Sequence, residues 1–442
     1  MTALDPTVPL LQELIRSRCV NDGAPDSGAE SRNADILEDF LRGGGLELER
    51  AGELPGRDSV ITRIESSDPT APTLLLMGHT DVVPVSPDGW SRDPFGGDLV
   101  DGWVWGRGAI DMLNLTAGMA VATRRLADSG WRPRGTLIFL GVADEEAGGS
   151  HGAGWLVDQR RDHVRADYVI TESGGVPVDT AAGQRLWVTV GEKGTAWSTL
   201  IVHGTPGHGS RPHGADNALV KAAQVVSRLA QSRGTVRIDD FWRRFVEGMA
   251  FPEDLAAALV DPDRVDEAIE RLPAGMASRA HASTRMTVSP TVCHGGSKTN
   301  VIPDRVELQI DVRTLPQQSR ATLERHLDEV LGELRPSVEL RVTHEAAASI
   351  SPVDTPLWEA IVSASRRLMP EATCVPALTT GGTDARFFRE IGVPAYGWGL
   401  YSRRISVDQW SAMFHGNDER VDVQSLELTA AVYEHVAREL LS

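Results

Sequence analysis

Three short apolar runs, each followed by polar residues, constrain the fold of this chain more than any other feature. The runs TLLLM, TLIFLGV and YVIT occupy residues 73–77, 136–142 and 168–171, and their length and composition are typical of buried strands. Residues 111–130 lie between the first two runs and carry an apolar helical periodicity that ends at Gly130. Strand, helix and strand in alternation predict an α/β fold: a mostly parallel sheet with helices on both faces.

Each run is followed by side chains that can bind a metal ion. His79 and Asp81 follow the first run, Glu145 and Glu146 the second, and Glu172 the third. In open α/β sheets, ligands bind outside the carboxyl ends of the strands. Alternate residues of a strand point to the same side, so Asp81 can accept the second ring N–H of His79 and fix its tautomer. Of the two adjacent acids, one can bind metal while the other stays free as a base.

Asp111 in RGAIDM and His415 in FHGNDERV extend this set of residues. Two imidazoles and several carboxylates suit zinc, cobalt or manganese better than calcium. Taken one at a time, these residues have simpler explanations. A histidine after a strand is usually a core or surface residue, DEE is usually a solvated turn, and Asp111 is well placed to cap a helix. Their joint occurrence at the ends of successive strands favours a metal site.

The composition narrows the classes of partner. The formal net charge of −18 argues against nucleic acid and anionic membranes, since both attract basic surfaces. The N-terminal residues lack a basic start followed by a long apolar region, and no apolar run approaches the ~20 residues of a membrane span. We therefore expect a cytoplasmic enzyme or binding protein. The three cysteines have no paired spacing, which argues against a disulfide framework or a thiolate zinc site.

The length of 442 residues predicts two domains. After residue 188 the pattern changes to strand, helix, two strands, helix and strand, the order of a ferredoxin-like domain. We expect this α+β domain to span residues 189–346, with a helical insertion at about 237–282. The alternating pattern returns afterwards, so residues 1–188 and 347–442 would form one discontinuous catalytic domain.

A series of motifs runs in order along nearly the whole chain: GHTDVVP (78–84), WSRDPFGGDLVDGWVWGRGAIDM (90–112), ADEEAGG (143–149), TESGG (171–175), GHGSRP (207–212), GGSKTNVIPDRVELQIDVRTLP (295–316) and TTGGTDARFF (379–388). The series resembles the dinuclear zinc peptidases, which include aminoacylase, succinyl-diaminopimelate desuccinylase, acetylornithine deacetylase and glutamate carboxypeptidase. This resemblance implies two Zn²⁺ ions per chain, with Co²⁺ or Mn²⁺ as possible substitutes. It places one ion on His79, Asp111 and Glu172, and the other on Asp111, Glu146 and His415.

The same resemblance assigns roles to residues that do not bind metal. Asp81 would support His79, Glu145 would be the general base, and the Asp111–Met112 peptide bond would be cis. His208 would stabilise the developing oxyanion, often in a neighbouring subunit's site. In these peptidases an exposed sheet edge or helix of the inserted domain often pairs two subunits, so the resemblance also implies a homodimer through this domain.

The resemblance also implies how substrate binds. Arg313 and Asn300 would bind the free carboxylate of a small-molecule substrate, an acyl amino acid or short peptide. Gly382 would let the substrate approach the backbone closely. The leading hypothesis is a metal-dependent hydrolase that cleaves an amide bond to an amino acid with a free carboxylate. The alternatives are an aminopeptidase of the related single-domain kind and a non-catalytic, metal-containing binding protein.

Overall fold

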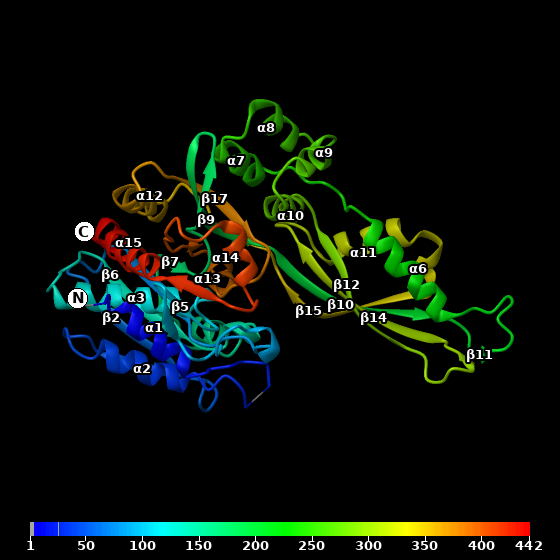
Figure 1. The fold of residues 1–442 in the computed structure, drawn as a ribbon, viewed down its shortest axis with the longest axis horizontal. Helices are drawn as coiled ribbons and strands as arrows, with labels where there is room; N and C mark the ends of the chain where they lie inside the picture. The colour runs from blue at the N-terminus through cyan, green and yellow to red at the C-terminus, as the bar shows by residue number, and fades with distance from the viewer. Residues whose placement is uncertain (1–3, 25) are drawn as a thin grey trace.

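The computed structural model describes residues 4–24 and 26–442, and its elements form two lobes (Figure 1). A ten-stranded sheet forms the core of the larger lobe. Its main path runs β1 (Leu48–Ala51), β2 (Ser59–Ile64), β6 (Thr136–Val142), β3 (Thr73–His79), β7 (Tyr168–Thr171), β18 (Ala395–Gly397), β9 (Gly183–Glu192) and β16 (Ser349–Ile350). Strands β8 (Pro177–Thr180) and β17 (Thr373–Thr379) also pair with β9.

The centre of this sheet is parallel. Strand β3 pairs in parallel with both β6 and β7, and β18 pairs in parallel with β7. His79 at the end of β3 lies opposite Val142 at the end of β6. The flanks are antiparallel, since β1, β2 and β16 each run opposite to a neighbour, as does β18 against β9. The α/β prediction is thus confirmed, with the parallel arrangement limited to the central strands and the β9–β17 pair.

Alternate side chains of β3 enter two different cores, which is why helices cover both faces of the sheet. Leu74 and Leu76 belong to the core formed with helices α1 (Thr7–Arg16), α2 (Ser31–Leu41), α3 (Leu113–Asp128), α12 (Pro356–Leu368) and α15 (Val423–Leu441). Leu75 and Met77 belong to the opposite core, with α4 (Ala153–Gln159), α5 (Arg161–Val164) and α13 (Ala385–Glu390). None of the helices within the described ranges combines the length and hydropathy that a membrane crossing requires.

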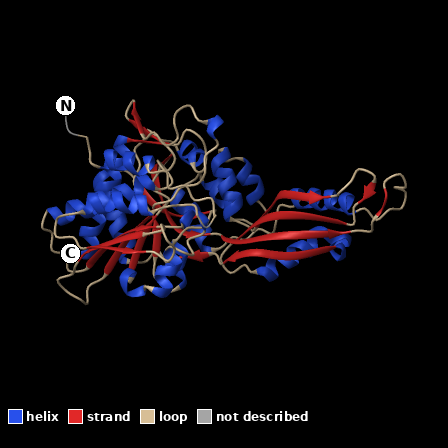
Figure 2. Cartoon of the chain, turned by 90° about the horizontal axis from the view of Figure 1, so that it is seen from below, coloured by secondary structure: helices blue, strands red, loops and turns tan. Residues whose placement is uncertain are grey.

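The smaller lobe is built on a four-stranded antiparallel sheet (Figure 2). Its order is β12 (Thr287–Gly295), β14 (Arg305–Thr314), β10 (Gly194–His203) and β15 (Val338–Ala346). Helices α6 (Ala218–Gln231) and α11 (Arg320–Leu331) contribute to the core on one face of it. In chain order the elements are β10, α6, β12, β14, α11 and β15, and this order with this sheet is the ferredoxin-like arrangement predicted from the sequence.

The inserted helices pack on the larger sheet, although they lie between α6 and β12 in the chain. They are α7 (Asp240–Met249), α8 (Glu253–Leu259), α9 (Val265–Glu270) and α10 (Ala274–Ser283). Trp242 of α7 shares a core with Trp187 of β9 and Val375 of β17, and it stacks on Phe245 with ring centroids 5.3 Å apart. The insertion therefore extends the hydrophobic core of the larger lobe.

Candidate metal centre

Five segments bring the predicted metal ligands to the carboxyl edge of the parallel strands. His79 is the last residue of β3, and Glu172 directly follows β7. Glu146 lies in a short 3₁₀ helix, Glu145–Ala147, after β6. Asp111 lies in the loop before α3, and His415 follows α14 (Val407–Met413). These side chains therefore meet at the carboxyl edge of the sheet, where the sequence predicted the site.

Asp111 lies between the two imidazoles. Its Oδ1 is 3.3 Å from Nε2 of His79, and its Oδ2 is 3.2 Å from Nε2 of His415. Each oxygen of one carboxylate thus faces a different histidine. This is the arrangement expected of a carboxylate that bridges two ions.

The remaining acids divide between the two histidines. Nε2 of His415 lies 3.4 Å from Oε2 of Glu146, and Nε2 of His79 lies 4.0 Å from Oε2 of Glu172. Potential ligand atoms of His79, Glu145 and Glu172 all lie within 4.8 Å of one another, and so do those of His79, Asp111 and Glu146. Glu145 therefore lies beside the other candidate ligands, within ligand distance of His79 and Glu172.

Asp81 contacts His79 in a different way from the one the sequence suggested. Nδ1 of His79 is 3.0 Å from the backbone carbonyl of Asp81 and 3.6 Å from its carboxylate. The carboxylate Oδ2 instead accepts hydrogen bonds from Nδ2 of Asn21, at 2.9 Å, and from the backbone N–H of Glu146, at 3.0 Å. Asp81 thus connects His79 to the turn that carries Glu145 and Glu146.

Burial makes this cluster electrostatically unusual. His79 is 1% exposed and Glu172 is 7% exposed. Burial and the neighbouring Glu172 raise the pKa of Glu145 well above its ordinary value, and burial and Asp111 do the same for the pKa of Glu172. Burial lowers the pKa of His79, but the hydrogen bond to Asp111 and the charge of Glu145 outweigh it and raise this pKa well above 6.5. The crowded, buried carboxyl groups therefore disfavour their charged forms unless cations balance them.

Three buried carboxylate oxygens in the cluster have no hydrogen-bond partner among the described residues: Asp81 Oδ1, Glu146 Oε1 and Glu172 Oε1. A buried carboxylate without a partner is costly, and such groups are normally paired or coordinate a metal. The unpaired oxygens, the crowding of carboxyl groups and the mixed nitrogen and oxygen donors all fit a pair of divalent cations.

The backbone at the site adopts conformations that few residues adopt. The Asp111–Met112 peptide bond is cis, as the family resemblance implied. His415, Asp144 and Ser173 have left-handed φ angles of 56°, 75° and 82°. Left-handed φ is uncommon outside glycine and is enriched at functional sites. Asp144 and Ser173 adjoin Glu145 and Glu172, so these conformations set the directions of the two acids.

The structure does not bring the other predicted residues into this cluster. His208 lies on β11 (Gly207–His208), beyond the far end of β10, where its Nδ1 is 2.8 Å from the hydroxyl of Ser210 (Figure 1). A strand of ten residues such as β10 spans roughly 30 Å at about 3.3 Å per residue. Asn300 adjoins His208, since its carbonyl accepts the N–H of Gly209 at 2.8 Å.

Arg313 and Gly382 lie closer to the junction of the lobes. Arg313 is near the end of β14 that faces the larger lobe, pairs with Asp311 at 2.8 Å and donates to the Thr195 hydroxyl at 3.1 Å. Gly382 is exposed in the loop after β17, and a Cβ placed on it would lie 3.2 Å from Nη1 of Arg386.

Several residues that support the cluster were not predicted from the sequence. Asn21 holds Asp81, and the buried pair of Arg107 and Glu419 holds the Asp111 loop. Asp384 is 2% exposed, and burial raises its pKa to about 7. Glu419 lies in the FHGNDERV motif and Asp384 in TTGGTDARFF. The other charged residues of these two motifs could therefore have been predicted as neighbours of the site.

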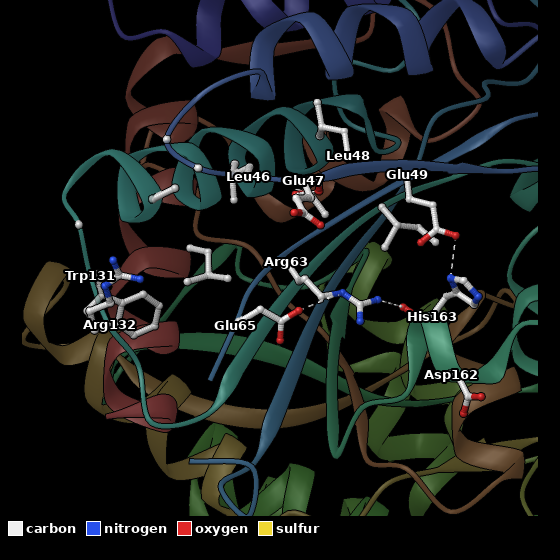
Figure 3. Close-up of a pocket in the computed structure, with 17 residues that line it drawn as sticks. Leu46, Glu47, Leu48, Glu49, Arg63, Glu65, Trp131, Arg132, Asp162 and His163 are labelled. Carbon is white, nitrogen blue, oxygen red and sulfur yellow. Dashed lines mark hydrogen bonds and ion pairs between the residues drawn. The ribbon is translucent and has the colours of Figure 1, made fainter. Parts of the chain in front are cut away.

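A hollow of about 780 Å³ elsewhere on the larger lobe contrasts with the metal centre (Figure 3). Residues of β1, β2 and the chain after α3 line it, and none of the predicted site residues is among them. Two of its contacts join polar groups of the lining: Arg63 donates to the backbone carbonyl of His163 at 2.9 Å, and Nδ1 of His163 lies 2.7 Å from Oε1 of Glu49. The acids that converge with two histidines are at the metal centre.

Known proteins share this fold and these segments. The model of peptidase family M20/M25/M40 matches residues 75–439. Human aminoacylase-1 is 27% identical over 421 residues, which cover 94% of this chain and 90% of that protein. Succinyl-diaminopimelate desuccinylase of Methylobacterium radiotolerans is 30% identical over 451 residues, covering 98% and 96%. The crystal structure of an M20 family metallo-carboxypeptidase from Sulfolobus solfataricus has a TM-score of 0.70 and 18% identity, covering 99% of both chains, and so shares the fold.

The fold, the ligand cluster and these relatives define a metal-dependent hydrolase with candidate ligands for two ions. The chain belongs to peptidase family M20/M25/M40.

Proposed function

We propose that this hydrolase cleaves the amide bond between an acyl or aminoacyl group and an amino acid with a free carboxylate, using two Zn²⁺ ions per chain. Co²⁺ or Mn²⁺ would suit the same donors. The observation that carries the proposal is the position of Asp111 between His79 and His415, with Glu145 beside the cluster. Aminoacylase-1 and the desuccinylase by name release acyl groups, which supports an N-acyl amino acid or a short peptide as substrate.

In this proposal, His79, Asp111 and Glu172 hold one ion, and Asp111, Glu146 and His415 hold the other. When bound, two such ions would lower the pKa of the attacking water and polarise the scissile carbonyl. Glu145 accepts the proton of the attacking water and delivers it to the leaving amine.

Asp81 fixes the geometry of this site. Its backbone carbonyl orients the ring of His79, and its carboxylate holds the N–H of Glu146.

Substrate recognition is assigned to the smaller lobe and the loop after β17. Arg313 and Asn300 would bind the carboxylate, Gly382 would leave room for the substrate backbone, and His208 would donate to the oxyanion. Because His208 and Asn300 lie at the far end of the smaller lobe, they would serve the site of a second copy in a homodimer. Leu219 and Val220 of α6, 48% and 55% exposed, offer an apolar surface for that contact.

The remaining assignments follow from the same proposal. Residues 1–188 and 347–442 form the catalytic domain, and residues 189–346 form the domain for substrate binding and dimerisation. The enzyme acts in the cytoplasm on small molecules and does not use nucleic acid or membranes as partners, consistent with its net charge of −18.

The deciding experiment is hydrolysis of a panel of N-acyl amino acids and free-carboxylate dipeptides by purified protein, with zinc and with a chelator. Cleavage that the chelator abolishes is the expected result. Cleavage of substrates blocked at the amino group separates this proposal from an aminopeptidase, which needs the free amine. No cleavage of any substrate by fully zinc-loaded protein would contradict the proposal.

A further inference from the structure

Two buried residues outside the proposed ligand set connect the segments that carry Asp111 and His415. Nη1 of Arg107 donates to Oε2 of Glu419 at 2.8 Å, and the two side chains are 2% and 0% exposed. The pair joins positions that are 312 residues apart in the sequence. Arg107 precedes Asp111 by a few residues, and Glu419 follows His415 by a few residues.

Glu419 holds the backbone from which the Asp111 side chain projects. Its Oε1 accepts the N–H of Ile110 at 2.6 Å and the N–H of Asp111 at 3.0 Å. Two successive N–H groups aimed at one carboxylate oxygen fix the orientation of both peptide units. The direction of the Asp111 side chain follows from that orientation.

Arg107 extends the connection to other ligand segments. Its Nη2 points at the carbonyls of His415 and Pro84, both 3.4 Å away. Strand β5 (Trp103–Trp105) pairs with β19 (Arg420–Asp422), and the N–H of Gly106 donates to the carbonyl of Glu419 at 2.9 Å. The Arg107–Glu419 pair therefore lies where this ladder ends and the two ligand loops diverge.

We propose that Arg107 and Glu419 are positioning residues that set the separation and orientation of Asp111 and His415, and thereby the affinity for the two metal ions. The inference rests on the proposed function, because it takes Asp111 as the shared ligand. It assigns the pair no contact with substrate. Partners that orient metal ligands typically change metal affinity about 10- to 100-fold when they are replaced.

The test compares Glu419→Gln with Glu192→Gln. Glu192 is the control, because it is 1% exposed and contacts Arg389 at 3.0 Å and the Thr383 hydroxyl at 2.6 Å, and neither contact is with the Asp111 loop. Zinc affinity is measured by competition with a chromogenic chelator, and the melting temperature is measured on the metal-free proteins. We expect Glu419→Gln to bind zinc about 10- to 100-fold more weakly. We expect Glu192→Gln to keep wild-type affinity, although both variants lose a buried charge.

Wild-type zinc affinity in folded Glu419→Gln would overturn the inference, and so would an equal loss of affinity in Glu192→Gln. If Glu419→Gln does not fold, Arg107→Lys is measured instead. Lysine keeps the charge but cannot span Glu419 and the two carbonyls, so the same weakening is expected, and wild-type affinity there would overturn the inference. A wild-type protein that binds no zinc would contradict the proposed function itself, which separates the two failures.

Discussion

His415 and Asp111 lie in loops far apart in the sequence, yet Nε2 of His415 is 3.2 Å from Oδ2 of Asp111. The other oxygen of Asp111 is 3.3 Å from Nε2 of His79. One carboxylate therefore connects the two halves of the candidate metal centre. Any change that removes one of its oxygens should affect both halves together.

Replacing Asp111 by Asn tests this connection. The amide keeps the size of the side chain but has one oxygen and no charge, so we expect metal content to fall below two ions per chain. Replacing residues that only orient ligands costs about 10- to 100-fold, and we expect the loss of catalytic efficiency in Asp111→Asn to exceed that. Metal content is measured by elemental analysis after gel filtration. Asp128→Asn, the same change on the half-exposed end of α3, is the control and should keep two ions.

Replacing Glu145 should slow the chemical step without releasing the metal ions. Replacing it by Ala removes the proposed base, and we expect turnover to fall by about 10²- to 10⁴-fold while both ions stay bound. Glu172→Ala is the matched comparison, since it removes a proposed ligand from the same buried cluster and should lose metal. Because Glu145 also lies within ligand distance of His79 and Glu172, loss of metal from Glu145→Ala would show that it binds an ion.

Some of the candidate ligands were predictable because they lie at the ends of strands whose pattern is visible locally, whereas Asp111 and His415 were proposed as ligands from the family resemblance. His79 is the last residue of an apolar strand and Glu172 directly follows another, and parallel strands bring their carboxyl ends together. Arg107 and Glu419 were not predictable in the same way. An arginine and a glutamate in separate loops form a buried pair only through the β5–β19 ladder, a contact between distant segments that no periodicity records.

The inserted helices show the same limit. Their apolar periodicity marks them as helices, but it does not say which sheet their apolar faces cover. Trp242 packs against Trp187 and Val375 of the larger sheet, while the chain on either side of the insertion belongs to the smaller one. The apolar periodicity of a helix identifies the face that is buried, but it does not identify the sheet or helix on which that face packs.

Lys193, the single residue between β9 and β10, predicts a pH dependence of stability. Its ammonium donates to the carbonyls of Ala282 and Arg285, both at 2.8 Å, and burial lowers its pKa from 10.5 to about 7. Between these values the unfolded chain holds a proton that the folded chain has released. The free energy of unfolding therefore increases as pH rises from about 7 towards 10.5. Below about 7, Lys193 is charged in the folded protein, and the full cost of burying that charge lowers the stability.

Lys193→Met isolates this group, because the other titrating residues are common to both proteins. We expect the free energy of unfolding of the metal-free wild type, relative to Lys193→Met, to increase across that pH window in urea denaturation. A difference that stays constant with pH would mean that Lys193 keeps its proton in the folded state.

Arg313 should determine the requirement for a free carboxylate. Replacing it by Met removes a charged donor, and hydrogen bonds to charged groups contribute about 1.5–3 kcal/mol, so we expect KM for N-acyl amino acids to rise about 10- to 100-fold. The same substrates with an amidated carboxyl group should be hydrolysed equally by both proteins. Arg305→Met, on the same strand and paired with Glu307, is the control and should leave KM unchanged. An equal rise in KM for the amidated substrates would contradict carboxylate recognition.

His208 tests whether one subunit completes the site of another. His208→Ala and Glu145→Ala are each expected to be nearly inactive alone. If His208 acts in the partner's site, a mixed dimer of the two variants contains one complete site, with Glu145 from one chain and His208 from the other. Random pairing would then restore about a quarter of wild-type activity after the two proteins are mixed and re-equilibrated.

The matched control is a mixture of Glu145→Ala with Asp111→Asn. Both defects lie in residues of the same chain's cluster, so every dimer in this mixture has two damaged sites and should stay inactive. Activity in the first mixture alone would establish a shared site. Inactivity in both mixtures would mean that His208 acts in the site of its own chain. The smaller lobe would then have to fold back across the roughly 30 Å length of β10 to bring His208 to the metal centre.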